Sequence, residues 1–159
     1  MIRELADFEK ALDRVEATES TLSSTLSFAP CSSDPHPDNS NGYAKTFLIL
    51  DPATKRVAGM ALYFNNYSTW LSCPGIYLED LFIRPDFRRR GYAKRLLRRL
   101  GEEAAKISGG KGRLEWSCLR WNQNALDTYK AMGASTQDEW IGLRVEGEGL
   151  TKMGDKVGV

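Results

Sequence analysis

The sequence predicts one domain, residues 1–159, with a mixed α/β or α+β fold in which helices flank a central sheet. Two observations support this prediction. Short β-rich runs bounded by turn residues alternate with longer segments whose apolar residues recur at helical spacing. The chain is also long enough to close one hydrophobic core, and 42% of its residues are apolar.

The first part of the chain predicts two helices and a loop. An amphipathic helix is expected from Arg3 to roughly Ala17, because apolar residues recur there at helical spacing, namely Leu5, Phe8, Leu12 and Val15. Thr18 can cap a second short helix that continues through Leu26. Residues 27–43 are rich in Ser, Pro, Asp, Asn and Gly, which predicts an irregular loop.

The middle of the chain predicts a β-hairpin and a third strand. Residues 45–50 and 57–64 are β-rich runs on either side of a short turn that contains a proline. Residues 76–83 are the third run, which ends at Arg84-Pro85 because proline cannot continue a strand ladder.

The second half predicts a long helix followed by further strands. From Tyr92 to about Lys106 the segment carries a single apolar stripe, formed by Ala93, Leu96, Leu97, Leu100 and Ala104. Residues 113–119 predict a fourth strand, residues 122–132 a helix whose end is marked by Gly133, and residues 139–146 a last strand.

Composition narrows the classes of function. The net charge is only +1, which argues against a dedicated nucleic-acid binder. The apolar runs are too short to cross a bilayer, and the N-terminus lacks the apolar region of a signal peptide. We therefore expect a cytoplasmic protein without a membrane partner. The lone His36 cannot build a histidine metal site, and no metal is expected.

One turn has the properties of an anion site. Arg88, Arg89 and Arg90 precede Gly91, directly before the long helix. The first turn of a helix has N–H groups without internal acceptors, and the helix dipole adds positive charge there. A diphosphate would be well held. The spacing fits neither a P-loop nor a dinucleotide fingerprint, which disfavours nucleotide hydrolysis and dinucleotide redox chemistry.

Three segments together resemble a known family. The run Arg88-Arg89-Arg90-Gly91-Tyr92-Ala93 is similar to the coenzyme A signature of the GNAT acetyltransferases, and it follows YLEDLFI and precedes WNQNALDTYKAMGA. The chain is most similar to the diamine (spermidine/spermine) and thialysine acetyltransferases. The resemblance implies a mixed, mostly antiparallel sheet flanked by helices and a homodimer. The family's first strand has no counterpart before Arg3, so we expect the sheet without it.

The resemblance also implies a site for acetyl-CoA as cosubstrate. Strand residues Leu81, Phe82 and Ile83 would hold the pantetheine arm. The phosphates fall on Arg88, Arg89, Arg90, Gly91, Tyr92, Ala93 and Lys94. Asn122 would make a further contact with the coenzyme. Tyr129 would contact it as well, and would protonate the departing thiolate. Asn122 and Tyr129 are about two helical turns apart, so both can face one ligand.

The amine substrate is expected beside acidic and aromatic residues. By resemblance, Glu79 contacts the amine and relays its proton, and Phe8 and Glu9 form an aromatic–glutamate pair at the same site. Glu79 and Asp80 are strand neighbours, so only one of them is expected to line a cleft directly. Further walls for a cation are Trp70, Asp138, Glu139 and Trp140. Ser68 stands where polyamine acetyltransferases carry an aspartate, which leaves shorter amines open.

These groups predict an N-acetyltransferase that acts on a primary amine of a small cation, of the diamine, polyamine, lysine or thialysine type. An alkyl ammonium has a pKa near 10.4, so a base must take its proton before attack, and Glu79 is the candidate, with Asp80 adding negative potential. Two alternatives stay open: a protein or peptide N-acetyltransferase, and a regulatory domain that binds acetyl-CoA without turnover.

Overall fold

The computed structural model describes residues 1–27 and 42–155, so most of the loop predicted at 27–43 lies outside the described residues. The chain falls into two compact units, Met1–Ser117 and Cys118–Val159. Each unit is described here on its own.

The first unit is built on a four-stranded sheet. Its strands are β1 (Lys45–Leu50), β2 (Val57–Ser68), β3 (Cys73–Ile83) and β4 (Leu114–Trp116), in the order β1-β2-β3-β4. β1 and β3 are each antiparallel to β2, and β4 runs parallel to β3, which confirms the mixed, mostly antiparallel sheet. All four strands arise from the predicted β-rich runs.

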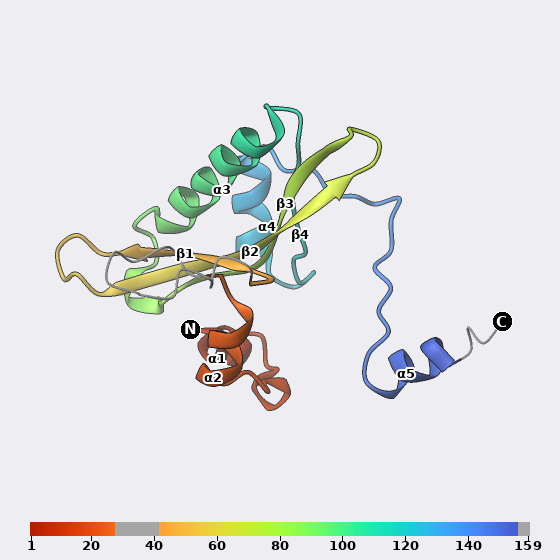
Figure 1. Ribbon diagram of the computed structural model, residues 1–159. Coiled ribbons are helices and arrows are strands. Elements are labelled where there is room, and N and C mark those ends of the chain that lie inside the picture. Colours follow the sequence, from red (N-terminus) through yellow and green to blue (C-terminus); the bar gives the residue numbers. More distant parts are fainter. Residues whose placement is uncertain (28–41, 156–159) are drawn as a thin grey trace, which may run out of the picture. The chain divides into compact units, whose positions relative to one another are not determined.

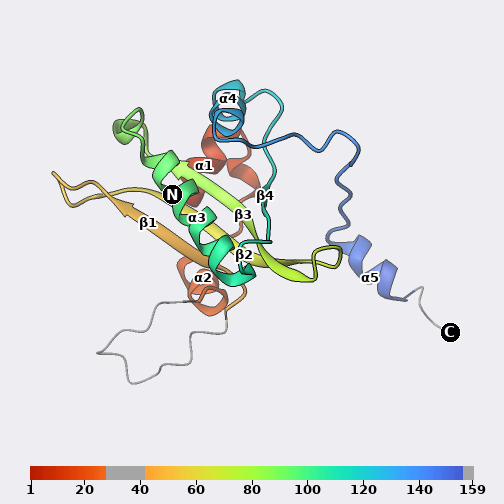
Figure 2. The same cartoon turned by 90° about the horizontal axis from the view of Figure 1, so that it is seen from above.

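Helices cover both faces of this sheet, as Figures 1 and 2 show. The long helix α3 (Tyr92–Ser108) lies across one face, and the short helices α1 (Ile2–Phe8) and α2 (Glu19–Thr25) lie on the other. The described residues of this unit also form two single-turn 3-10 helices, η1 (Leu12–Arg14) and η3 (Pro85–Phe87). The sheet is therefore flanked by helices, as predicted.

The core lies between α3 and the sheet. The predicted stripe of α3 is buried at Leu96, Leu97, Leu100 and Ala104. Leu100 and Ile76 of β3 are the largest fully buried side chains in the described structure. Burial of one such side chain contributes about 1.5–3 kcal/mol. This packing holds α3 against β1, β2 and β3.

The N-terminal helix is shorter than predicted, because α1 ends at Phe8. Lys10 has a left-handed backbone with φ 60°, which cannot continue a right-handed helix. The chain then makes the single turn η1 before Val15 becomes extended. Apolar residues at helical spacing therefore lie on two short turns, not on one helix. The second helix is confirmed, and Thr18 caps it in a capping box with Thr21.

The second unit contains two helices. The predicted helix is confirmed as α4 (Gln123–Ala131), with Asn122 as its N-cap and Gly133 at φ 92° just beyond its end. The strand predicted at 139–146 is wrong, since that segment pairs with no described strand and exposes Ile141 and Leu143 by 81% and 88%. A strand also needs a hydrogen-bonded neighbour, and a β-rich sequence pattern does not show whether one is present. Helix α5 (Glu148–Asp155) was not predicted, because two glycines lower its helix propensity.

Within residues 1–27 and 42–155, no helix has the length and apolar character that a membrane span needs. The same residues contain no group of three or more His, Cys, Asp or Glu side chains arranged to hold a metal ion.

Candidate active site

The predicted anion site is a tight turn between η3 and α3, here named the arginine turn (Arg88–Ala93). Two of its residues have left-handed backbones, Arg89 with φ 62° and Gly91 with φ 79°. A non-glycine residue with this φ is strained and marks a turn whose shape its surroundings impose. The arginine turn is therefore a defined segment that passes through the helix N-cap, Gly91, into the first two residues of α3.

The start of α3 is open and positively polarised. A Cβ built on Gly91 would meet no atom within 4 Å, so the space beside the backbone is free of protein. The first turn of α3 contains no acidic residue, and Arg89 and Lys94 are exposed next to it. Helix N–H groups, dipole and nearby cations all favour an anion at this point. The geometry fits a diphosphate that approaches the backbone closely.

Arg88 connects this turn to several predicted site residues. Its Nε donates a hydrogen bond to the carbonyl of Ile83 at 3.0 Å. Its guanidinium also lies 5.2 Å from the ring centroid of Phe8 and 5.8 Å from that of Phe82. Such cation–π contacts are favourable within about 6 Å. Arg88 thus joins the end of β3 to the end of α1.

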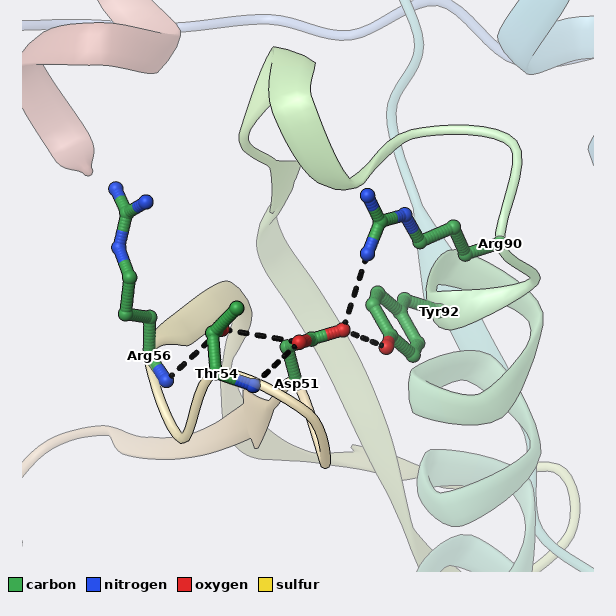
Figure 3. A network of polar contacts seen from close by, with 5 residues as sticks. All are labelled: Asp51, Thr54, Arg56, Arg90 and Tyr92. Atoms are coloured by element: carbon green, nitrogen blue, oxygen red, sulfur yellow. Dashed lines mark hydrogen bonds and ion pairs between the residues drawn. The ribbon is translucent and has the colours of Figure 1, made fainter.

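Arg90 and Tyr92 turn toward Asp51, a residue that sequence reasoning did not single out. The Tyr92 hydroxyl donates to Asp51 Oδ1 at 2.6 Å and Arg90 Nη1 lies 3.2 Å from the same oxygen. The other oxygen, Oδ2, accepts from the backbone N–H and the hydroxyl of Thr54, each at 2.9 Å. Figure 3 shows the side chains of Arg90 and Tyr92 pointing to this carboxylate. An Asp-Pro pair after a strand signals only a local turn.

The Asp51 carboxylate is stabilised in its ionised form. The hydrogen bond from Tyr92, followed by the contacts from Thr54 and the charge of Arg90, lowers the pKa of Asp51 to about 2. In turn, the bond to Asp51 raises the pKa of the Tyr92 hydroxyl. Both side chains are buried, with 2% of Asp51 and 6% of Tyr92 exposed. The network is therefore a charged but satisfied contact between β1 and α3.

The middle of β3 contains a β-bulge at Glu79. Leu62 of β2 pairs with Asp80 while its neighbour Tyr63 pairs with Leu78, so Glu79 is an extra residue on β3. A bulge interrupts the regular alternation of side chains between the two faces of a strand. The expectation that Glu79 and Asp80 point to opposite faces assumed an uninterrupted strand, and it does not apply at this point.

Three carboxylates gather at the bulge. Burial of Asp80, followed by the negative charges of Glu79 and Glu9, raises the pKa of Asp80 to about 6. Glu9 itself is the C-cap of α1, and burial raises its pKa as well. The acidic cluster (Glu9, Glu79 and Asp80) thus brings together three predicted substrate residues from segments that are far apart in the sequence. Its negative charge favours a cation nearby.

The other predicted residues belong to the turn between β2 and β3 and to the second unit. Trp70 is 87% exposed in the turn between β2 and β3, roughly 20 Å along the strand from Asp80. In the second unit, the Asn122 side chain accepts from the N–H of Ala125, and the partly buried Tyr129 lies on the same helix. The loop around Asp138 curls into a hollow of about 310 Å³, lined by residues 136–140, which include Glu139 and Trp140.

Residues 14–134 match the model of the family described as Acetyltransferase (GNAT) family. The fold and this match define an acyltransferase. The chain belongs to this family, as the resemblance predicted.

Relatives of known activity align along almost the whole chain. The sequence is 32% identical to the L-ornithine N5-acetyltransferase of Arabidopsis thaliana, over 100% of this chain and 82% of that protein. It is 34% identical to the thialysine N-epsilon-acetyltransferase of Caenorhabditis elegans, over 98% of this chain and 88% of that protein. These relatives are N-acetyltransferases.

Solved structures agree on the fold. An integron cassette protein from the mobile metagenome of V. cholerae has a TM-score of 0.70 and 25% identity, covering 95% of this chain and 85% of that one. An aminoglycoside N-acetyltransferase in complex with CoA has a TM-score of 0.55 and 20% identity, covering 91% of this chain and 87% of that one.

Proposed function

We propose that the protein transfers an acetyl group from acetyl-CoA to a primary amine of a small cationic molecule. The observation that carries this proposal is the acidic cluster. Two of its residues, Glu79 and Asp80, lie on β3, and a short connection joins the end of β3 to the anion site at the start of α3. A cationic acceptor and an anionic donor would each find complementary charge. Both named relatives act on amino acids with a side-chain amine, which supports an acceptor of this size.

The donor would lie at the arginine turn. The N–H groups at the start of α3, with the exposed Arg89 and Lys94, are suited to the diphosphate of coenzyme A. Backbone groups of Leu81, Phe82 and Ile83 would hold the pantetheine arm, as in the family. Asn122 and Tyr129 are proposed as further contacts with the donor.

The acidic cluster also offers the base that the reaction needs. The substrate ammonium must lose a proton before its nitrogen can attack the thioester carbonyl. A base is most effective when its pKa lies near the working pH. Asp80 meets this condition because its pKa is raised to about 6. We therefore propose that Asp80 takes the proton, directly or through water, while Glu79, the base predicted from sequence, strengthens the attraction for the cation.

The rest of the reaction follows from the same groups. The free amine forms a bond to the acetyl carbon, the C–S bond breaks, and the sulfur leaves as a thiolate. A thiol has a pKa of about 8.5, so the thiolate can leave without prior protonation. Tyr129 is proposed to donate a proton to it and return the thiol, and the second proton that the nitrogen loses as it becomes an amide restores the tyrosine hydroxyl. The products are an acetamide and coenzyme A.

We further propose that residues 1–159 act as one cytoplasmic acetyltransferase domain that forms a homodimer. The family match supports one domain because it runs across the boundary between the two units. The dimer is supported by resemblance to the diamine acetyltransferases. Light scattering on the purified protein would test the dimer: a mass of one chain, 17.8 kDa, would contradict it.

A single assay tests the proposed reaction. Release of free thiol from acetyl-CoA is followed with ornithine, thialysine, lysine, putrescine, spermidine and a lysine-containing peptide as acceptors. A small diamino acceptor should give the highest kcat/KM. Turnover with the peptide alone would indicate a protein acetyltransferase. Binding of acetyl-CoA by calorimetry without any thiol release would indicate a regulatory domain.

A further inference from the structure

Asp51 contacts the residues on both sides of Gly91. One carboxylate oxygen, Oδ1, accepts from Arg90, directly before the glycine, and from Tyr92, directly after it. The other oxygen, Oδ2, accepts from the backbone N–H and the hydroxyl of Thr54 in the turn after β1. The two oxygens therefore have separate tasks, one in the β1–β2 turn and one at the arginine turn (Figure 3).

The surroundings keep this contact in place. The Tyr92 ring packs in a buried cluster with Ala58 and Phe87, against which Ile49 and Ile83 also pack. The Arg90 guanidinium lies 5.3 Å from the centroid of the Phe87 ring. Charge-assisted hydrogen bonds are strong and directional, and the one from Tyr92 to Asp51 is buried. Asp51 thus holds the first residue of α3 at a fixed point above the sheet.

The arginine turn needs such support because its backbone is strained. Arg89 has φ 62° although it is not a glycine, and Gly91 follows with φ 79°. Strained conformations persist only where neighbouring contacts over-determine them. Without the contacts from Asp51, the turn would be free to relax and its N–H groups would lose their common direction.

We propose that Asp51 is a positioning residue for the acetyl-CoA site, which acts through Tyr92 and Arg90 to hold the arginine turn in its anion-binding shape. This inference rests on the proposed function. It also assigns Arg90 a bracing role in place of the phosphate contact that sequence predicts. Arg89 and Lys94, whose side chains are exposed, remain the cations for the phosphates.

Two donors separate positioning from general stability. Acetyl-CoA carries the diphosphate, whereas S-acetyl-pantetheine has the same thioester and pantetheine arm without it. The variants are Tyr92→Phe, which keeps the buried ring, and Asp51→Asn, which keeps the shape of the carboxylate. Thr54→Val is the matched control, since it removes a hydrogen bond to Oδ2 and leaves the Oδ1 contacts intact.

The expected result is selective for the donor with a diphosphate. Tyr92→Phe and Asp51→Asn should each lower kcat/KM for acetyl-CoA by about tenfold, mainly through KM, and weaken CoA binding in calorimetry by a similar factor. Their kcat/KM for S-acetyl-pantetheine and their KM for the amine should stay within about twofold of wild type. Thr54→Val should match wild type with both donors.

Other outcomes would overturn the inference. An equal loss with both donors would make Asp51 a residue of general stability only. If Asp51→Asn does not fold, Tyr92→Phe alone decides: wild-type binding of CoA by this variant would contradict the positioning role. If wild type itself binds no CoA, the proposed donor site is wrong and the inference falls with it.

Discussion

Glu9, at the end of the first helix, lies within electrostatic reach of Asp80 in β3, where burial first, and then the charges of Glu79 and Glu9, raise the pKa of the Asp80 carboxyl to about 6. Asp80 is therefore protonated below about pH 6 and able to accept a proton above it. Wild-type kcat/KM should show an inflection near this pH. Asp80→Asn should lower kcat/KM by about hundredfold and remove the inflection, whereas the matched variant Glu79→Gln should keep it.

A stability measurement checks the same assignment without activity. Because folding raises the pKa of Asp80, this group favours the folded state below about pH 4, and that contribution is lost as pH rises through about 6. Asp80→Asn should therefore unfold at a higher urea concentration than wild type at pH 7. In the kinetic measurement, a wild-type pH profile of kcat/KM without an inflection near pH 6, or an inflection that Glu79→Gln removes, would indicate that Glu79 is the base and not Asp80.

Tyr129 is expected to help the leaving group. Tyr129→Phe should lower kcat by about tenfold with little change in the KM of the amine, because a thiolate can depart without protonation. Steady-state kinetics at saturating acetyl-CoA measure both constants. Tyr43, which is 85% exposed, provides a Tyr→Phe control that should leave them unchanged. A tenfold rise in the amine KM with unchanged kcat would make Tyr129 a binding residue.

Two glycines of the α3 region should respond oppositely to alanine. Gly91 has φ 79°, so Gly91→Ala should destabilise the fold by roughly 1–2 kcal/mol and place a methyl group in the open space proposed for the donor. Gly101 lies inside α3 with no atom within 4 Å of a built Cβ, so Gly101→Ala should stabilise by about 0.5–1 kcal/mol. Urea unfolding and CoA calorimetry measure the two effects. Unimpaired CoA binding by Gly91→Ala would contradict the donor position.

Asp51 should control stability in acid. Folding lowers the pKa of this carboxyl to about 2, so its contribution is present above about pH 4 and is lost as pH falls toward 2. Asp51→Asn should thus be less stable than wild type at pH 6, and the difference should shrink below pH 4. Urea unfolding at several pH values measures it. The exposed Asp86 offers an Asp→Asn control, expected within about 0.5 kcal/mol of wild type at pH 6.

Sequence patterns predicted most of the helices and strands because the residues that define each element lie close together in the chain. The four strands follow β-rich runs, and α3 follows an apolar stripe that is buried as expected. Errors arose where backbone conformation or pairing decides. The left-handed Lys10 ends α1, and no apolar spacing reveals such a residue. Residues 139–146 have a strand's composition, but a strand also needs a neighbour, which the pattern does not supply.

The candidate site divides in the same way. Arg88 to Gly91 and the start of α3 are contiguous in the chain, so a local motif was enough to predict an anion site there. The link between Asp51 and Tyr92 spans 41 residues and connects a turn to a helix, which no local motif encodes. Likewise, the choice between Glu79 and Asp80 as the base depends on a β-bulge. The burial of Asp80 and the charges beside it follow from the irregular pairing of β3 with β2.

The extra residue on β3 also makes this strand tolerant of shortening. Loss of Glu79 alone would leave every other partner of β3 in place, with Leu78 opposite Tyr63 and Asp80 opposite Leu62. A one-residue deletion should therefore close the ladder, raise the thermal unfolding midpoint, and cost the enzyme affinity for its cationic acceptor. A lower midpoint would mean that the irregular strand is the more stable one. With the expected higher midpoint, the stability of the sheet and the binding of the acceptor would be separate properties that depend on Glu79 in opposite directions.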